Sequence, residues 1–296
     1  MISAVSYNRR VRVLGFLLMV RFCAMSQAMD LSGYFRRIGY KGRWQPDLAL
    51  LSALTAAHTQ SIPFENLDVL LGRPISLEPD ALFQKLVVER RGGYCFEQNG
   101  LFFEVLRELG FHVAPLSARV RLQRPRDYTP PRTHVFIRVE LDGESWLTDV
   151  GVGALSLTSP LRLTTRDEQA TLHEPRRILR EGALLYHQVR FGAEWQDVCE
   201  FTLEEMPPID REVGNWFTSA HPNSHFKNRL VVARAAPEGQ RLSILNDQFT
   251  LRERHGTAST RPIASAPELL EVLQRQFGLS FPVGTRFGAP GAPWPV

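Results

Sequence analysis

The sequence predicts an α+β protein, and three successive patterns along the chain support the prediction. From Asp30 to about Gly110, apolar residues recur at the spacing of amphipathic helices. From Phe111 to about residue 210 they alternate with polar residues, as in strands. Further strand-like segments and one amphipathic helix, "PELLEVLQRQFG", follow. We therefore expect a leader over 1–28, a helical bundle over 29–110, a β domain over 111–210, and an α/β domain with a loose tail over 211–296.

Each predicted helix has its own start or stop signal. "PDLALLSALTAAH" opens with Pro46, which suits a first helical position, and "PDALFQKLVVER" opens in the same way with Pro79. A third helix, "NGLFFEVLRELG", stops at Gly110. The residues expected to face the core are Leu50, Leu51, Leu54, Ala57 and His58, then Leu82, Phe83, Leu86 and Val87, and finally Leu101, Phe102, Val105, Leu106 and Leu109.

The composition is that of a soluble globular protein. Apolar residues make up 44% and charged residues 22% of the 296 positions, and no apolar stretch is long enough to span a membrane. The net charge of +4 is spread over scattered lysines and arginines, which disfavours a nucleic-acid partner. The three cysteines, Cys23, Cys95 and Cys199, show no CxxC spacing. We therefore expect no disulfide framework, no metal site and a reducing, cytoplasmic location.

The first residues resemble a weak secretory signal. "NRRVRVLGFLLMVRFCAMSQA" has a basic start, a short apolar run and small residues, but Arg21 interrupts the apolar run. Met25 and Met29 offer later starts, and "MDLSGYFRRIGYKG" already has the pattern of a fold. A disordered or over-extended leader over 1–28 is favoured over export.

Cys95 lies in "RRGGYCFEQNG", at the predicted start of a helix. A buried cysteine is usually only a small apolar residue, and glycine turns before helices are common. Here, however, Gly92 and Gly93 have no side chains, so the backbone can approach neighbouring groups closely at this turn. The positive end of the helix dipole favours a thiolate at this place, and first-turn N–H groups would lie near a developing oxyanion. Cys95 is therefore a candidate nucleophile.

His134 and Asp149 are candidate partners for that nucleophile. They lie in "THVFIRVELDGESWLTDVG", where two alternating segments flank Asp142-Gly143, a strong signal for a two-residue hairpin loop. Such a loop places His134 diagonally across from Asp149 on one face, whereas a three-residue loop would put them on opposite faces. Each residue alone is more often structural, but one register brings both together. His221 and His225 in "HPNSH" lack the pattern of a zinc helix.

With these residues assembled, the chain resembles the arylamine N-acetyltransferase family from about Met29 to Phe287. The resemblance rests on five motifs in order: "IPFENL", "RGGYCFE", "RTHVFIRV", "WLTDVGVG" and "SAHPNSHF". It implies a helical bundle, a β-barrel and an α/β lid around a cysteine-protease-like Cys-His-Asp core. It also implies ping-pong transfer without a metal. The Cys95 thiolate, paired with His134 and oriented by Asp149, takes an acetyl group from acetyl-CoA. An aromatic amine or a hydrazine then accepts the group.

The resemblance implies further positions in the substrate pocket, although ordinary core is the commoner role of phenylalanine. These positions are Phe64, Phe96, Val120, Thr133, Val152, Gly153 and Phe226. Val152 stands where the family often has an aromatic residue, which would widen or reshape the acceptor pocket. Glu65 and Arg91 are expected to form a structural ion pair that braces the cysteine loop.

Two other interpretations of the same residues stay open. A cysteine hydrolase or a transglutaminase-like enzyme can use Cys, His and Asp in this chain order. A protein without enzymatic activity would keep the fold with an inert Cys95. The sequence also leaves open whether the acceptor is a drug-like arylamine, a hydrazine or an endogenous aromatic intermediate. It equally allows longer acyl donors and any oligomeric state.

Overall fold

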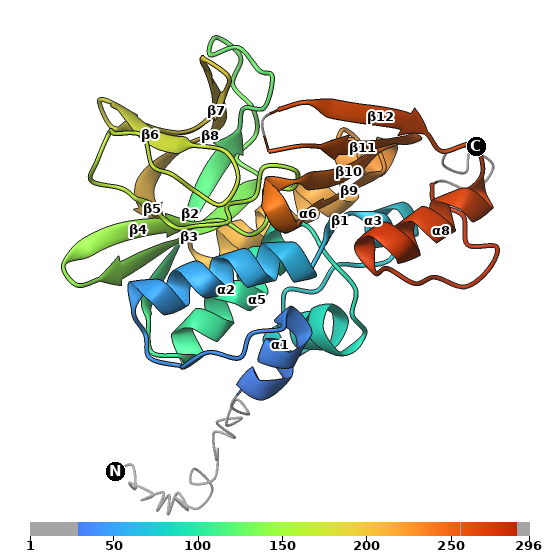
Figure 1. The fold of residues 1–296 in the computed structure, drawn as a ribbon, viewed down its shortest axis with the longest axis horizontal. Helices are drawn as coiled ribbons and strands as arrows, with labels where there is room; N and C mark the ends of the chain where they lie inside the picture. The colour runs from blue at the N-terminus through green and yellow to red at the C-terminus, as the bar shows by residue number, and fades with distance from the viewer. Residues whose placement is uncertain (1–28, 255, 289–296) are drawn as a thin grey trace, which may run out of the picture.

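The computed structural model describes residues 29–254 and 256–288 (Figure 1). Within them helices come first, a seven-stranded sheet follows, and a mixed group of strands and helices ends the chain, so the α+β class is confirmed. The predicted leader over 1–28 and the last part of the predicted tail, 289–296, lie outside the described residues. The described part of the chain contains no helix that is both long and apolar enough to cross a membrane.

The N-terminal part packs its helices around an apolar core. Its elements are α1 (Leu31–Ile38), α2 (Leu48–Ser61), the short β1 (Phe64–Glu65), α3 (Leu67–Leu70), α4 (Pro79–Phe83) with a π-helical turn over Gln84–Val88, and α5 (Cys95–Glu108). As predicted, α4 begins at Pro79 and α5 stops just before Gly110, which has a positive φ of 88°. The predicted core positions of the three helices are buried, except Ala57 and Phe83, which are partly buried.

The predicted start of α2 at Pro46 is wrong. The helix begins at Leu48 because Asp47 is its N-cap residue. The Asp47 carboxylate accepts a hydrogen bond from the backbone N–H of Leu50 at 2.8 Å, which satisfies one of the free donors of the first turn. Pro46 therefore lies just before the cap and not inside the helix.

The central sheet is a nearly closed barrel. Its strand order is β5-β4-β3-β2-β8-β7-β6, and the two outer strands, β5 and β6, contact each other. The strands are β2 (His112–Val120), β3 (His134–Leu141), β4 (Glu144–Thr148), β5 (Leu161–Arg162), β6 (Arg176–Glu181), β7 (Leu184–Phe191) and β8 (Glu194–Glu205).

One side chain closes the seam between β5 and β6. The backbone of Gln169 exchanges hydrogen bonds with Arg176 of β6 at 2.7 and 2.9 Å. The Gln169 side-chain amide exchanges two more with the backbone of Arg162 in β5, at 2.8 and 3.0 Å. The amide thus takes the place of a strand backbone and bridges the gap between β5 and β6.

The β3–β4 hairpin has the predicted two-residue loop. Leu141 pairs with Glu144, and the register continues to Ile137 opposite Thr148. Asp142 and Gly143 both have positive φ, at 53° and 78°, as a type I′ turn requires. The register therefore brings the start of β3 and the end of β4 to the same place.

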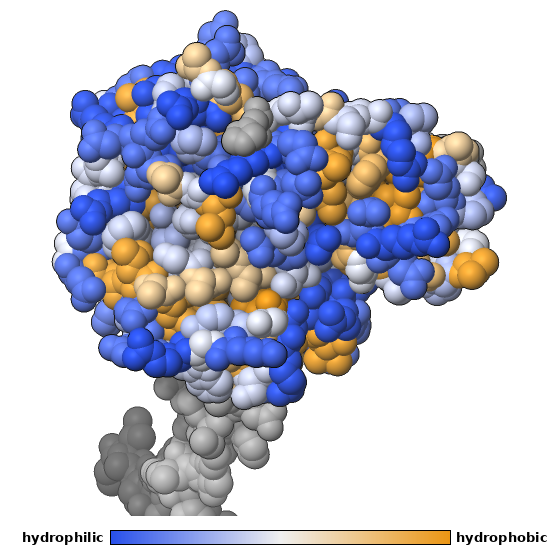
Figure 2. Space-filling model, viewed as in Figure 1, coloured by the Kyte–Doolittle hydropathy of each residue, from blue (hydrophilic) through white to orange (hydrophobic). Residues whose placement is uncertain are grey.

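The C-terminal part contains a second sheet that reaches back to the first helices. Its order is β1-β9-β10-β11-β12, and Phe64 of β1 pairs with Ala233 of β9. The other elements are α6 (Pro208–Ala220), α7 (His225–Asn228), β9 (Val231–Ala235), β10 (Arg241–Leu245), β11 (Gln248–Arg252), β12 (Ala258–Pro262) and α8 (Ala266–Phe277). On the face in Figure 2, apolar side chains show between hydrophilic ones over this sheet. Leu245 of β10 is half exposed.

Candidate active site

Cys95 is the first residue of α5, as predicted. Its side chain is buried, and the Sγ atom lies 3.5 Å from the carbonyl oxygen of Thr133. The Glu97 carboxylate accepts from the N–H of the preceding Tyr94 at 3.1 Å and so caps the helix start. The thiol is therefore held at the N-terminal end of a well-capped helix of 14 residues.

The loop before Cys95 needs its glycines and is braced by buried charges. A Cβ atom on Gly92 would lie 2.0 Å from the carbonyl oxygen of Pro63, so no larger residue fits. The predicted ion pair is present, with Arg91 Nη2 2.7 Å from Glu65 Oε1. Asp68 accepts from the same guanidinium at 3.1 Å. These contacts fix the path of the chain into α5.

His134 and Asp149 meet at the open end of the β3–β4 hairpin. The Nε2 atom of His134 lies 2.8 Å from Asp149 Oδ2, and both side chains are buried. Since Nε2 faces the carboxylate, the other ring nitrogen, Nδ1, is the one left for the Cys95 thiol. The structure thus brings together the three residues that the sequence singled out.

Asp149 is fixed by two further donors. Asn99, one turn after Cys95 in α5, donates to Asp149 Oδ1 at 2.9 Å and to the carbonyl oxygen of Val135 at 2.7 Å. The N–H of Gly151 donates to the same carboxylate oxygen at 3.0 Å. A Cβ atom on Gly151 would lie 2.8 Å from Cys95 Cα, so glycine lets this loop press against the start of α5.

The electrostatics favour a charged histidine. Burial alone would lower the pKa of His134, but the Asp149 carboxylate and then the nearby Cys95 raise it to about 10. Burial would likewise raise the pKa of Asp149, but His134 and the donors around it bring that pKa below its ordinary value. At neutral pH the pair is therefore an imidazolium and a carboxylate, with the positive charge next to the thiol.

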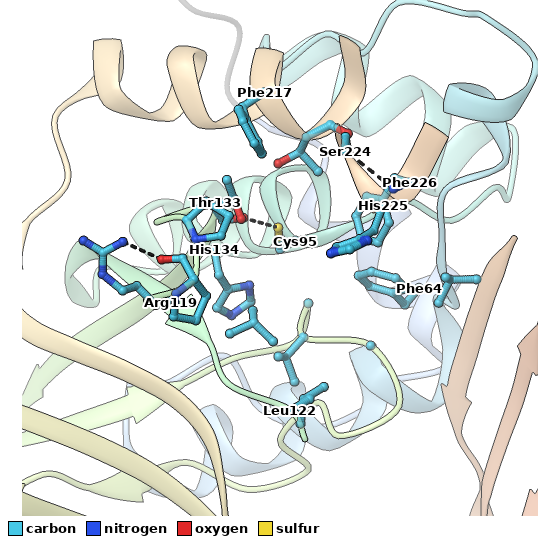
Figure 3. Close-up of a pocket in the computed structure, with 18 of the residues that line it drawn as sticks. Phe64, Cys95, Arg119, Leu122, Thr133, His134, Phe217, Ser224, His225 and Phe226 are labelled. Atoms are coloured by element: carbon cyan, nitrogen blue, oxygen red, sulfur yellow. Dashed lines mark hydrogen bonds between the residues drawn. The ribbon is translucent and has the colours of Figure 1, made fainter. Parts of the chain in front are cut away.

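Cys95 and His134 open onto a cavity of about 670 Å³ (Figure 3). Six of the seven predicted pocket residues line it: Phe64, Val120, Thr133, Val152, Gly153 and Phe226. The rings of Phe64 and Phe226 meet edge to face at 5.9 Å between centroids. The cavity is therefore large, mostly apolar, and has the thiol in its wall.

The seventh residue, Phe96, is not among those that line this cavity. Its buried ring packs edge to face against Tyr94, and a Cβ atom on Gly214 of α6 would lie 2.5 Å from its tip. Because Phe96 follows Cys95 on the helix, its side chain turns away from the side on which the thiol faces the cavity. In the structure Phe96 is a core residue between α5 and α6.

Comparison with known proteins places these features in one family. The sequence profile of a family described as N-acetyltransferase matches residues 47–285. The chain is 46% identical to the arylamine N-acetyltransferase of Mycolicibacterium smegmatis, over 85% of this chain and 92% of that protein. It is 43% identical to the Escherichia coli K12 arylamine N-acetyltransferase, over 84% and 88%. The structure of Mycobacterium marinum arylamine N-acetyltransferase in complex with CoA superimposes with a TM-score of 0.81 at 41% identity, over 84% and 92%.

The chain belongs to the arylamine N-acetyltransferase family.

In this member of the arylamine N-acetyltransferase family, sequence reasoning missed part of the cavity wall. Phe217 and Thr218 of α6, together with Ser224 and His225 at the start of α7, line one side. The loop between β2 and β3 lines another with Leu122, Tyr128, Thr129, Pro130 and Pro131. The motif "SAHPNSHF" contains two of these residues, Ser224 and His225, next to the predicted Phe226. The β2–β3 loop carried no usable signal.

A second cysteine lies beneath the site. The ligand atoms of His134, Asp149 and Cys199 all lie within 4.8 Å of one another, a spacing that a metal ion could use. The chemistry opposes this, because burial and then the Asp149 carboxylate raise the pKa of Cys199 well above its ordinary value. A protonated thiol is a poor metal ligand, and Asp149 and His134 already satisfy each other. Cys199 therefore acts as a small neutral residue that supports the site.

Proposed function

We propose that this protein transfers the acetyl group of acetyl-CoA to an aromatic amine or a hydrazine through an acetyl-Cys95 intermediate. The observation that carries the proposal is the contact chain Cys95–His134–Asp149 in the wall of a largely apolar cavity. Family membership supports the donor, since a relative of the same fold has been solved in complex with CoA.

In the first half-reaction the Cys95 thiolate attacks the carbonyl carbon of the acetyl thioester. The tetrahedral oxyanion is stabilised by the first-turn N–H groups of α5, next to the attacking sulfur. As the bond from carbon to the CoA sulfur breaks, the His134 imidazolium gives its proton to the departing thiolate. The products are acetyl-Cys95, free CoA and a neutral His134 held by Asp149.

In the second half-reaction the amine nitrogen attacks the acetyl-Cys95 carbonyl. Neutral His134 takes the proton that the nitrogen loses, and the bond from carbon to Cys95 sulfur breaks. The acetylated amine leaves, and the thiolate and imidazolium are restored. Because Asp149 raises the pKa of His134, it stabilises the charged form that both half-reactions begin or end with.

The cavity wall supports a flat aromatic acceptor. Phe64, Phe226 and Phe217 present rings to the space next to the thiol (Figure 3). Val152 adds a small aliphatic side chain to the wall. Apolar walls favour a ring, while a small nucleophilic nitrogen can reach the sulfur. Because a working thiol must stay reduced, we also place the enzyme in a cytoplasmic, reducing compartment; Cys95 and Cys199 are both free.

The test is the intact mass of the protein after brief exposure to acetyl-CoA and after a chase with an arylamine. We expect one acetyl adduct that disappears on the chase, no adduct on Cys95→Ala, and a normal adduct on the matched variant Cys199→Ala. An adduct lost equally fast without amine would favour the cysteine hydrolase. No adduct on the folded wild type would contradict the proposal.

A further inference from the structure

A second cavity, of about 320 Å³, lies where the ends of α2 and α8 meet the loop that precedes Cys95. It shares no lining residue with the active-site cavity. Four arginines line it, Arg37, Arg90, Arg234 and Arg275, and the described lining contains no aspartate or glutamate. We call it the arginine cavity. Neither 1–28 nor 289–296 contains an acidic side chain.

Backbone carbonyl groups orient two of these arginines, and among the described residues no carboxylate pairs with either of them. Arg37 Nη1 donates to the carbonyl oxygen of Ser61 at 2.7 Å, at the end of α2. Arg234 donates to the carbonyl oxygens of Gln60 at 3.1 Å and Gln276 at 2.7 Å, at the ends of α2 and α8. These bonds cap the helix ends, yet each acceptor is a neutral group. The guanidinium groups are thus held in place around the cavity.

The positive charges crowd one another. Among the described residues, Arg37, Arg90 and Arg234 form no ion pair, whereas Arg275 pairs with Glu271 at 2.8 Å. Burial, followed by the nearby Arg90 and Arg234, lowers the pKa of Arg37 to about 10. Burial also lowers the pKa of Arg234. Converging guanidinium groups without a carboxylate are an unfavourable arrangement that a bound anion would relieve.

We propose that the arginine cavity binds a phosphate-type oxyanion, held by Arg90 together with Arg37 and Arg234, which line the same cavity. Planar guanidinium groups bind tetrahedral oxyanions through paired charge-assisted hydrogen bonds. The volume accommodates a phosphate group together with part of a molecule that carries it. Inorganic phosphate and a phosphate monoester share this chemistry. The site is separate from the acetyl-transfer chemistry, so either proposal can fail without the other.

Arg90 is the residue on which to test the site. It is exposed, makes no side-chain hydrogen bond among the described residues, and already has a positive φ of 56° that glutamine or lysine would share. Arg90→Gln removes the charge, and Arg90→Lys keeps the charge without the planar guanidinium group. Arg43→Gln is the matched control, because Arg43 is also an exposed arginine and lies outside the cavity.

Isothermal titration with inorganic phosphate and thermal unfolding, both at low ionic strength, measure the binding. We expect saturable binding to the wild type and to Arg43→Gln, an affinity at least about tenfold lower for Arg90→Gln, and an intermediate affinity for Arg90→Lys. Without phosphate, Arg90→Gln should melt at a higher temperature than the wild type, because one of the crowded charges is gone. With phosphate the order should reverse.

Two outcomes would overturn the proposal: a wild type that does not bind phosphate saturably, or an Arg90→Gln variant that binds it as the wild type does. Phenyl phosphate separates the two sources of the anion. Tighter binding than that of inorganic phosphate would point to an organic phosphate, and equal or weaker binding would point to the free ion. The KM for acetyl-CoA should not change in Arg90→Gln.

Discussion

Asn99 connects α5, the helix that begins at Cys95, to both ends of the β3–β4 hairpin. Its amide donates to Val135 and Asp149 and accepts from the N–H of Val150 at 3.0 Å, all in a buried setting. It touches no reacting atom, so it is a positioning residue. We expect Asn99→Ala to lower kcat by roughly 100-fold with little change in KM, because a small misplacement of Asp149 and His134 is costly.

The same change should lower the free energy of unfolding by about 1–3 kcal/mol, since it leaves buried donors and acceptors unpaired. Steady-state kinetics and urea unfolding measure the two effects. Asn228→Ala, at an exposed position in α7, is the control and should change neither. Loss of stability with unchanged kcat would show that Asn99 only supports the fold.

The histidines differ in charge, and this can be observed directly. His134 should titrate near pH 10, whereas burial lowers the pKa of His58 and of His173 to about 4 each. Histidine NMR spectra at pH 7 should therefore show an imidazolium for His134 and neutral rings for the other two. In Asp149→Asn the pKa of His134 should fall below its wild-type value, because the carboxylate that raises it most is gone while burial remains.

The sign of the pH effect on stability follows from the raised pKa of His134. The contribution of His134 to the free energy of unfolding is complete below about pH 6.5, which is the pKa of histidine in the unfolded chain. The contribution is lost as the pH rises through about 10. Urea unfolding between about pH 6.5 and pH 10 should show that Asp149→Asn does not lose this stability as the pH rises. An unchanged slope in the variant would contradict the assigned charge state.

At the scale of elements, the loop after β4 must lie against the start of α5. Gly151→Ala would place a methyl group 2.8 Å from Cys95 Cα, a backbone atom of α5 that cannot move easily. We expect the loop to move away, with a loss of about 1–3 kcal/mol in unfolding free energy and a large loss of kcat. Gly182→Ala is the control, because it has positive φ but nothing within 4 Å. Gly182→Ala should lower the free energy of unfolding without changing kcat. Equal losses of kcat in the two variants would disprove the role of the contact between Gly151 and Cys95.

The sequence pattern around the turn predicted this hairpin correctly. Contacts between residues far apart in the chain could not be predicted in this way. Asp142-Gly143 determined the register of His134 and Asp149 because a turn and its flanking strands are neighbours in sequence. The pairing of Phe64 with Ala233 could not be predicted, since a two-residue strand carries no periodicity. The division of the chain near residues 110 and 210 stays a prediction. The orientation of Phe96 depends on how α6 packs, which the sequence alone did not show.

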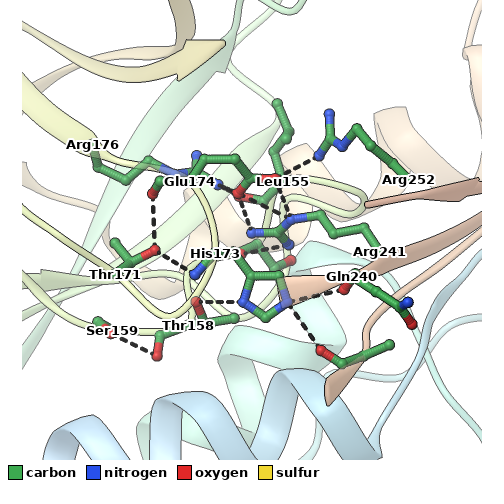
Figure 4. A network of polar contacts seen from close by, with 12 residues as sticks. Leu155, Thr158, Ser159, Thr171, His173, Glu174, Arg176, Gln240, Arg241 and Arg252 are labelled. Carbon is green, nitrogen blue, oxygen red and sulfur yellow. Dashed lines mark hydrogen bonds and ion pairs between the residues drawn. The ribbon is translucent and has the colours of Figure 1, made fainter. Parts of the chain in front are cut away.

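At the scale of the whole molecule, Glu174 joins the barrel to the C-terminal sheet (Figure 4). Its carboxylate lies 3.0 Å from Arg176 of β6, 2.7 Å from Arg241 of β10 and 2.7 Å from Arg252 of β11. Glu174→Gln would leave buried guanidinium groups unpaired. We expect a loss of about 3–5 kcal/mol in unfolding free energy by urea titration. Glu168→Gln, which breaks an exposed pair with Arg190, should cost about 0–1 kcal/mol.

This junction should also be sensitive to acid. Burial would raise the pKa of Glu174, but Arg241 and the other arginines hold it well below the ordinary range. Its contribution to stability is therefore present above about pH 4.3 and is lost as the pH falls toward the folded-state pKa. Wild type and Glu174→Gln should converge in stability at low pH. A constant difference between them would contradict the ionic role of Glu174.

The contacts of Gln169 between β5 and β6 bear on whether the protein associates with itself. An open sheet edge is a template on which foreign chains can add strands, and here a single amide occupies it. Gln169→Ala should therefore increase self-association on mild heating, as measured by light scattering, while acetyl transfer at low temperature is unchanged. Unaltered scattering would mean that the neighbouring loop protects the edge. If scattering does increase, a side chain outside the catalytic machinery limits the concentration at which the protein stays in solution.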